Sequence, residues 1–208
     1  MSTEGQIEWR PNSTDIQRWF AGKELTTDWL SHHLETWIKV LGPLRSRELS
    51  VLEVGAYEGR SAIAFLELLP GCHVTTIDFW RKSETEARCR RNLAPYGDRV
   101  SIVKGFAGGI LDEFHEEKRA FDVIYLDGGK RAGAVLARSV QAWSLLNRGG
   151  ILIWDDLDWG VGRPDEERPF LGIRMFLDCF RSCVNILHQG RQLLLRKVSD
   201  WPRPTSHP

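Results

Sequence analysis

Two short acidic segments, each directly after an apolar run, are the residues best suited to chemistry in this sequence. Asp127 follows the run 121–126, and Asp155 and Asp156 follow the run 151–154. If the two runs form neighbouring strands, about 4.8 Å apart, the three carboxylates can converge on one ion. Three oxygen ligands, with no sulfur or histidine pair nearby, suit Mg²⁺. The alternative is that Asp155 or Asp156 caps a turn and that Asp127 contacts a bound cofactor.

Lys130 stands shortly after Asp127 and could supply acid–base chemistry at the same place. A hydroxyl group is a poor nucleophile at neutral pH, because its pKa is about 10 or higher. A bound Mg²⁺ lowers that pKa, and a nearby amine can take the proton. Asp127 and Lys130 are therefore candidate catalytic residues. The alternative for Lys130 is a solvated side chain at the start of a helix.

The stretch 51–61 predicts a turn from a strand into a helix, of the kind that holds a nucleoside cofactor. Gly55 and Gly59 let the backbone turn sharply and let a ligand approach the main chain closely. A dinucleotide site would need a third glycine, and Glu53 beside the turn would repel a pyrophosphate, so NAD is disfavoured. A carboxylate there suits a cationic ligand end, such as the amino group of S-adenosylmethionine. Asp78 ends the next apolar run, where it can reach the ribose hydroxyls of such a cofactor.

Apolar runs that alternate with helical segments must position these residues. Five runs predict strands, at 49–54, 73–78, 100–103, 121–126 and 151–154. Because they are too continuous for a half-exposed sheet, they predict a buried, mainly parallel sheet with helices between the strands. Gln189-Gly190 then predicts a hairpin that joins 184–187 to 192–198. The predicted fold class is α/β, a doubly wound, mainly parallel seven-stranded sheet with a C-terminal antiparallel hairpin.

Three segments are expected along the chain: an N-terminal helical or lid extension at 1–48, a cofactor-binding domain at 49–198 and a Pro-rich disordered tail at 199–208. From Thr27 an apolar set at helical spacing predicts a helix that Gly42-Pro43 ends. Its aromatic residues either lie on the core or, at the corner 26–29, form a lid over the cofactor pocket. The corner that ends in Trp29 is thus a second candidate wall of the site.

The motif Leu52-Glu-Val-Gly-Ala-Tyr-Glu-Gly-Arg-Ser61 resembles the first cofactor motif of the class I S-adenosylmethionine-dependent methyltransferases. The similarity runs from about residue 27 to residue 198. It is greatest to small O-methyltransferases of the catechol O-methyltransferase type and their bacterial relatives. It implies a Rossmann-like fold and S-adenosylmethionine as cofactor. The implied cofactor-binding residues are Glu53, Gly55, Ala56, Tyr57, Gly59 and Ser61 around the methionine part, Asp78 at the ribose, Phe79 and Trp80 beside the adenine, Gly105, Phe106 and Ala107 on its other side, and Asp127. The alternative for Phe79 and Trp80 is simple core packing.

The same resemblance implies the reaction, which is Mg²⁺-assisted O-methylation of a small-molecule hydroxyl group. Catechol-type enzymes carry Asp, Asp and Asn where this chain has Asp127, Asp155 and Asp156, and they share Lys130. Asp156 departs from that pattern and adds charge to the predicted metal site. Two alternatives stay open: a metal-independent N- or carboxyl-methyltransferase, and a regulatory protein that binds the cofactor without transferring its methyl group.

The methyl acceptor is expected outside the strand ends, beneath the polar loop 157–169. Trp154, Trp159 and Arg163 are the candidate substrate-binding residues. Aromatic side chains favour a flat or apolar acceptor, and Arg163 favours one with an anionic group, while Trp154 can equally belong to the core.

The composition argues against several other classes of protein. Lys plus Arg and Asp plus Glu each total 28, so no overall charge favours nucleic acid or an anionic membrane. No apolar run approaches the roughly 20 residues of a membrane span, and the first residues do not resemble a signal peptide. None of the four cysteines forms a C-x-x-C pair, which indicates reduced thiols in a cytoplasmic protein. The expected partner is a small-molecule acceptor, and the aromatic N-terminal segment is consistent with a homodimer.

Overall fold

A seven-stranded sheet forms the centre of the computed structural model, which describes residues 9–201. The strands are β1 (Leu49–Val54), β2 (Cys72–Asp78), β3 (Val100–Lys104), β4 (Phe121–Leu126), β5 (Leu146–Trp154), β6 (Val184–Gln189) and β7 (Leu193–Lys197). Their order across the sheet is β3-β2-β1-β4-β5-β7-β6. The strands β1 to β5 pair in parallel, and β7 is antiparallel to both β5 and β6. The predicted fold class, including the C-terminal antiparallel hairpin, is confirmed.

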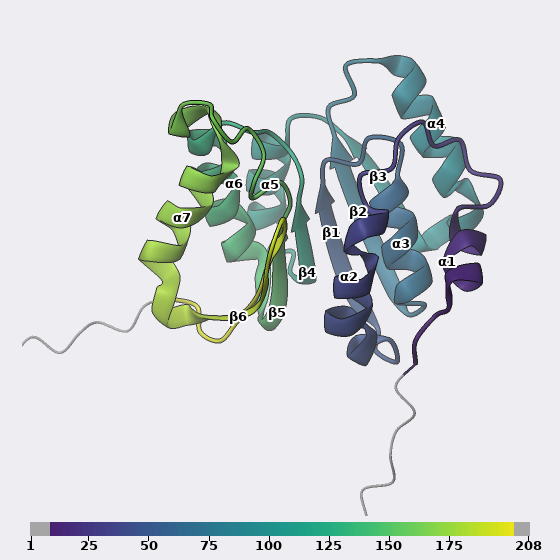
Figure 1. Cartoon of the computed structure of the whole chain (residues 1–208), viewed down its shortest axis with the longest axis horizontal. Coiled ribbons are helices and arrows are strands. Elements are labelled where there is room, and N and C mark those ends of the chain that lie inside the picture. Colours follow the sequence, from purple (N-terminus) through teal and green to yellow (C-terminus); the bar gives the residue numbers. More distant parts are fainter. Residues whose placement is uncertain (1–8, 202–208) are drawn as a thin grey trace, which may run out of the picture.

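Helices cover both faces of this sheet (Figure 1). They are α1 (Ser13–Phe20), α2 (Leu34–Leu41), α3 (Arg60–Leu68), α4 (Ser83–Leu93), α5 (Ala107–Glu116), α6 (Ala132–Leu145) and α7 (Pro169–Phe180), with short 3₁₀ turns η1 (Ser31–His33), η2 (Gly42–Leu44), η3 (Ala94–Arg99), η4 (Asp165–Glu167) and η5 (Arg181–Cys183). Helices α1 to α4 pack on one face and α5 to α7 on the other. Side chains alternate along each strand, so Val51 enters the first apolar cluster and Leu52 the second. This two-sided burial explains why the strands read as continuous apolar runs.

The direction of strand progression reverses between β1 and β4, which pair although β2 and β3 lie between them in the sequence. In open parallel sheets, ligands bind in the crevice outside the carboxyl ends of the strands at such a reversal. Gly55, Asp127 and Asp155 directly follow β1, β4 and β5, and Asp78 is the last residue of β2. The fold therefore brings the predicted cofactor turn and the predicted acidic segments to one edge of the sheet.

The N-terminal helix is shorter than predicted. The carboxylate of Asp28 accepts hydrogen bonds from the backbone N–H groups of Leu30 and Ser31, at 3.2 and 2.9 Å. These bonds fold the corner into a turn that is followed by η1, and α2 begins at Leu34. An Asx-type cap has thus replaced the first predicted helical turn.

The fifth strand begins earlier than predicted. The strand β5 starts at Leu146, which pairs with Phe121, and a register irregularity follows before Ile151 pairs with Val123. The segment 148–150 therefore lies within the strand. Gly150 leaves room for the neighbouring strand, because a Cβ at this position would meet the carbonyl oxygen of Asp122 at 2.9 Å.

The predicted N-terminal extension 1–48 and tail 199–208 both fall partly outside the described residues. Within them, Trp37 is fully buried, stacks on Phe65 with 4.4 Å between ring centroids, and donates to Gln192 at 2.8 Å. At the other end, the indole of Trp143 donates to the carbonyl oxygen of Asp200 at 2.6 Å. No helix within residues 9–201 has the length and apolar character needed to cross a membrane.

Candidate active site

In the turn after β1, the backbone at Gly55 lies directly against the backbone at Asp127, which follows β4. Gly55 has a φ of +103°, and a Cβ at this position would lie 2.7 Å from the carbonyl oxygen of Asp127. Gly59, with a φ of +87°, is the N-cap of α3, and a Cβ there would press on Leu93 at 3.1 Å. Both positions require glycine because of conformation and space together. The first N–H groups of α3 remain available at this end of the cleft.

Glu53 lies behind this turn and supports it. Its side chain is fully buried, and its two carboxylate oxygens accept hydrogen bonds from the hydroxyl groups of Ser61 and Thr76. Burial raises the pKa of Glu53 to about 7; the two hydrogen bonds oppose this shift, and the charge of Asp78 adds to it. The prediction placed Glu53 around the methionine part of the cofactor. The structure places it beneath the turn, where it orients Ser61.

Asp78 connects the turn to the end of β2. Its carboxylate accepts the backbone N–H of Tyr57 at 2.9 Å and that of Trp80 at 2.8 Å. Trp80 is 5% exposed and its indole donates to the carbonyl oxygen of Tyr57 at 2.7 Å, so its side chain belongs to the core. Of the two alternatives for Trp80, the structure therefore selects core packing over a place beside the adenine.

Two exposed aromatic rings lie next to Asp78 and line neither of the two cavities described below. Phe79 follows Asp78, and Phe106 precedes α5; the rings stack with 4.3 Å between centroids and are 43% and 70% exposed. Gly105 is held to β2 by its N–H, which donates to the carbonyl oxygen of Asp78 at 3.0 Å. Ala107 begins α5 and packs against the apolar cluster of that face. Exposed, stacked rings beside Asp78 form a flat apolar surface at the position predicted for the adenine.

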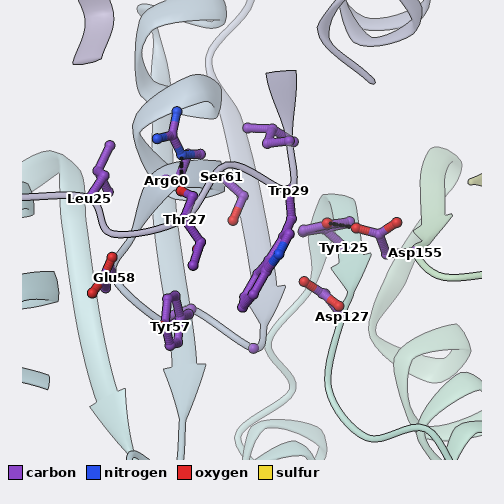
Figure 2. A pocket seen from close by; sticks show the side chains of 13 residues that line it. Leu25, Thr27, Trp29, Tyr57, Glu58, Arg60, Ser61, Tyr125, Asp127 and Asp155 are labelled. Carbon is purple, nitrogen blue, oxygen red and sulfur yellow. Dashed lines mark hydrogen bonds between the residues drawn. The ribbon is translucent and has the colours of Figure 1, made fainter. Parts of the chain in front are cut away.

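Two adjoining cavities open over these strand ends. The larger has a volume of about 520 Å³ and the smaller one of about 40 Å³. Both are lined by Trp29, Gly55, Tyr57, Asp127 and Asp155. Figure 2 shows the smaller cavity, in which the ring of Trp29 lies between Tyr57 on one side and Asp127 on the other. The predicted site residues that line one or both cavities are Gly55, Ala56, Tyr57, Ser61, Asp78, Asp127, Lys130, Asp155, Asp156 and Trp159.

Lys130 pairs with two of the three aspartates at this edge. Its ammonium lies 3.0 Å from the carboxylate of Asp127 and also donates to Asp156. Burial raises the pKa of Asp127 to about 6; Lys130 opposes this shift and the charge of Asp155 adds to it. Asp156 adopts a left-handed conformation, with a φ of +61°, which directs it to this pair.

Asp155 faces a different set of partners. It accepts the hydroxyl of Tyr125 and the backbone N–H of Asp156, and it lies 3.6 Å from Nε2 of His33. His33 is 7% exposed; burial lowers its pKa, while Asp155 opposes that shift. Burial has the opposite effect on the phenol of Tyr125, whose pKa it raises well above the ordinary value. His33 lies in the segment after Thr27 that was predicted as a helix, and no role in the site was predicted for it.

The predicted three-aspartate metal site is not formed as these side chains lie. Among residues 9–201, no group of three or more His, Cys, Asp or Glu side chains is arranged to hold a metal ion. The physical reason is that Lys130 takes the cation position between Asp127 and Asp156, while Asp155 turns to Tyr125 and His33. The oxygen donors are of the type that Mg²⁺ prefers, but their present geometry does not fit one ion.

Comparison with known proteins gives the family. A family model described as methyltransferase domain matches residues 52–157, just over half of the chain. The chain belongs to this methyltransferase family. The match begins at the cofactor motif and ends just after Asp156, and it confirms the resemblance to class I S-adenosylmethionine-dependent methyltransferases. None of the curated proteins that were searched matches the sequence.

Solved structures share the fold at low sequence identity. The O-methyltransferase from Bacillus cereus, in complex with S-adenosylhomocysteine, aligns with a TM-score of 0.67 and 21% identity, over 90% of this chain and 92% of its own. TomG, an O-methyltransferase from Streptomyces achromogenes in complex with S-adenosylmethionine, gives 0.62 and 20%, over 94% and 100%. MycE, a methyltransferase of mycinamycin biosynthesis in complex with Mg, S-adenosylhomocysteine and mycinamycin VI, gives 0.66 and 16%, over 97% of this chain and 58% of MycE. The chain thus spans a little over half the length of MycE. At identities this low, the structural similarity establishes the common fold alone.

The structure separates the three residues predicted to bind the acceptor. Trp159 lines the larger cavity. Trp154 is 1% exposed and its indole donates to Ser139 at 2.8 Å, so it packs in the core and lines neither of the two cavities. Arg163 lies 3.7 Å from Glu167, with its guanidinium over the ring of Trp159, and is not one of the cavity-lining residues. The prediction of an anionic acceptor, which rested on Arg163, loses its support.

Four residues that sequence reasoning did not assign to the acceptor side do line this cavity of the methyltransferase: His32, His33, Asp158 and Arg191. Arg191 comes from the turn between β6 and β7 and pairs with Asp158 at 3.1 Å. The adjacent histidines could have been noticed as an unusual pair within an apolar segment. No local signal marks Arg191, because only the antiparallel pairing of β7 with β5 brings the hairpin to this edge.

Proposed function

We propose that this methyltransferase transfers the methyl group of S-adenosylmethionine to a hydroxyl group of a small molecule. The observation that carries the proposal is the pair of adjoining cavities, which share Gly55 and Asp127 at the point where the strand order reverses. A donor in one cavity and an acceptor in the other would then meet above these two residues. The cofactors named for the structural neighbours TomG and the Bacillus cereus enzyme support the same assignment.

The cofactor would lie across the carboxyl ends of β1 and β2, with one end near Ser61 and the other near Phe79. Its methionine end would meet the start of α3 near Ser61, where helical N–H groups attract a carboxylate. Its ribose hydroxyls would donate to Asp78, whose carboxylate keeps lone pairs beyond the two backbone N–H groups that it accepts. Its adenine would lie against the exposed rings of Phe79 and Phe106. Each contact matches a chemical group of the cofactor to a residue of suitable type.

The acceptor would occupy the larger cavity, beside Asp127 and Lys130. Methyl transfer from a sulfonium is an in-line displacement, in which the acceptor oxygen forms the new bond to carbon as the sulfur–carbon bond breaks. The hydroxyl proton must leave at the same time. Lys130 is the candidate to accept it, as the neutral amine that forms once its ammonium has released a proton to water. The walls of the cavity would hold the oxygen in line with the methyl group, and alignment of this kind contributes up to roughly 7–11 kcal/mol.

Mg²⁺ assistance of this reaction remains a proposal from the sequence. MycE was solved with Mg, and the three aspartates of this chain supply oxygen donors of the right kind. As they lie, however, Lys130 and the Tyr125–His33 pair engage these carboxylates. We therefore derive no step of the reaction through a metal ion.

The test is a search for S-adenosylhomocysteine formation with matched acceptors that present a hydroxyl, an amine or a carboxylate. Turnover with hydroxyl acceptors alone supports the proposal, and turnover confined to amines or carboxylates would replace it with the N- or carboxyl-methyltransferase alternative. Calorimetry that detects cofactor binding, without product from any acceptor, would favour the regulatory alternative. Each assay is repeated in EDTA, with Mg²⁺ then restored, so that the metal requirement is measured separately.

A further inference from the structure

A segment before α2 closes the smaller cavity from above. This segment, residues 24–29, is called the strap. It crosses the cofactor turn, and its residues Leu25, Thr27 and Trp29 line the cavity (Figure 2). Trp29 leans on Tyr57, with 5.1 Å between ring centroids, and is 60% exposed. The strap and Trp29 therefore lie directly against the space in which the methionine end of the proposed cofactor would bind.

A buried carboxylate fastens the strap to the cofactor turn. Glu58 is 1% exposed, and its two oxygens accept the backbone N–H of Thr26 at 2.6 Å and the hydroxyl of Thr26 at 2.9 Å. Arg88 of α4 donates to the same carboxylate at 3.0 Å. Burial alone would raise the pKa of Glu58, but the bonds from Thr26 and Arg88 outweigh it and the pKa lies below its ordinary value. Glu58 is therefore an anion at neutral pH, and its bonds to the strap are charge-assisted.

Other contacts of the strap flank this point. Asn92 accepts the N–H of Glu24 at 2.7 Å and donates to its carbonyl oxygen at 3.1 Å. Arg60 donates to the carbonyl oxygen of Thr27 at 3.0 Å. Glu58 lies between these two anchors and directly follows Tyr57, on which Trp29 rests. Its bonds are thus the contacts that join the middle of the strap to the wall of the cofactor cavity.

We propose that Glu58 is a positioning residue that holds the strap, and through it Trp29, closed over the methionine end of the cofactor. The inference rests on the proposed function, since it assumes that S-adenosylmethionine occupies this cavity. When the Glu58 bonds are weakened, the strap opens more easily and the cofactor product dissociates faster. Glu58 does not line the acceptor cavity, and Trp29 is the one strap residue that does.

The chain offers a matched control for this test. Glu84 also pairs with Arg88, but it is exposed and makes no contact with the strap in any of the interactions described for it. Glu58→Gln removes the charge that holds Thr26, and Glu84→Gln removes the same charge from the other side of Arg88. Thr26→Val, at an exposed position, leaves Glu58 itself unchanged and removes the hydroxyl that donates to it, together with the 3.4 Å contact of that hydroxyl with the hydroxyl of Tyr57.

The experiment measures the affinity of the intact protein for S-adenosylhomocysteine by calorimetry, together with the KM values for S-adenosylmethionine and acceptor. Glu58→Gln should weaken binding by about 10-fold, Thr26→Val by about 3-fold, and the double variant by less than their product, because both act on one contact. The KM for S-adenosylmethionine should rise more than the KM for the acceptor, because Trp29 is the one strap residue that lines the acceptor cavity. Glu84→Gln should match the wild type, and hydrogen exchange across the strap should speed up in the first two variants.

Two results would overturn the inference alone: wild-type affinity in Glu58→Gln, or a loss of affinity that Thr26→Val does not share in any degree. If Glu58→Gln does not fold, Thr26→Val still decides, since it leaves the core intact. Failure of the wild type itself to bind S-adenosylhomocysteine or S-adenosylmethionine would instead overturn the proposed function, and this inference with it.

Discussion

Replacing Glu53 by Gln should make the free energy of unfolding less dependent on pH. The carboxyl group of Glu53 is fully buried, and burial raises its pKa from 4.5 to about 7. The native state therefore holds this proton more tightly than the unfolded chain, so the native protein loses stability as the pH rises between these two values. Since one pKa unit corresponds to about 1.4 kcal/mol, the wild type should lose roughly 3 kcal/mol from this group between about pH 4 and about pH 8.

The assay is urea unfolding of the ligand-free protein at several pH values between about pH 4 and about pH 8. Glutamine keeps the size of the side chain and can still accept the hydroxyl of Thr76 or Ser61. Any constant cost of the substitution cancels, because the prediction concerns only how the difference between the two proteins changes with pH. Glu116→Gln, at an exposed position of α5, is the control and should follow the wild type. Parallel curves for the wild type and Glu53→Gln would refute the assignment of a raised pKa to this carboxyl group.

Three further substitutions test other parts of the site. Gly55→Ala should destabilise the protein by about 1–3 kcal/mol in urea unfolding, because its Cβ would meet the carbonyl oxygen of Asp127 at 2.7 Å and its φ is +103°; unchanged stability would show that the turn can relax. Asp78→Asn should keep the backbone contact to Tyr57 but weaken S-adenosylhomocysteine binding about 10-fold in calorimetry, since it removes a charged acceptor for the ribose. Lys130→Ala should lower kcat by about 100-fold or more with little change in the KM for S-adenosylmethionine, and near-normal kcat would remove Lys130 as the base.

The cofactor turn and the sheet could be predicted from the sequence because their signals are local. Strand-length apolar runs fix which residues are buried, and the glycines of the turn are required by its own geometry. The close approach of Gly55 to Asp127 gives this requirement a physical cause, since a side chain at Gly55 would separate β1 from β4. The position of Asp127 at the same edge then follows from the parallel pairing of the two strands.

The facing of individual side chains could not be predicted in the same way. Trp80 has a positive φ of +39°, and this conformation directs its indole back to Tyr57. Trp154 is the last residue of β5 and points to the face covered by α6, where Ser139 accepts its N–H. Just past a strand end, a one-residue difference or a change in the sign of φ reverses the face that a side chain meets. Aromatic residue type therefore carried no information on which rings reach the cavity.

The partners of the charged groups also lay beyond local reasoning. Three carboxylates at one edge predict a cation, because without one their repulsion would be uncompensated. The structure supplies part of that charge from Lys130, and it directs Asp155 to Tyr125 and His33. Sequence spacing shows that a cation is needed, but the contact of Asp155 with the N-terminal segment arises only when α2 packs on the sheet.

The site is assembled from two kinds of contact. Gly55 and Asp127, which directly follow the neighbouring strands β1 and β4, lie close together and line both cavities, so they form a common floor. The roof comes from the strap, whose bonds to Glu58 and Asn92 join residues more than 30 positions apart. A floor fixed by the sheet resists movement, because any shift must break the parallel pairing of β1 with β4. A roof held by a few side-chain bonds can open at lower cost, and this difference in strength supports our proposal that the cofactor exchanges by way of the strap.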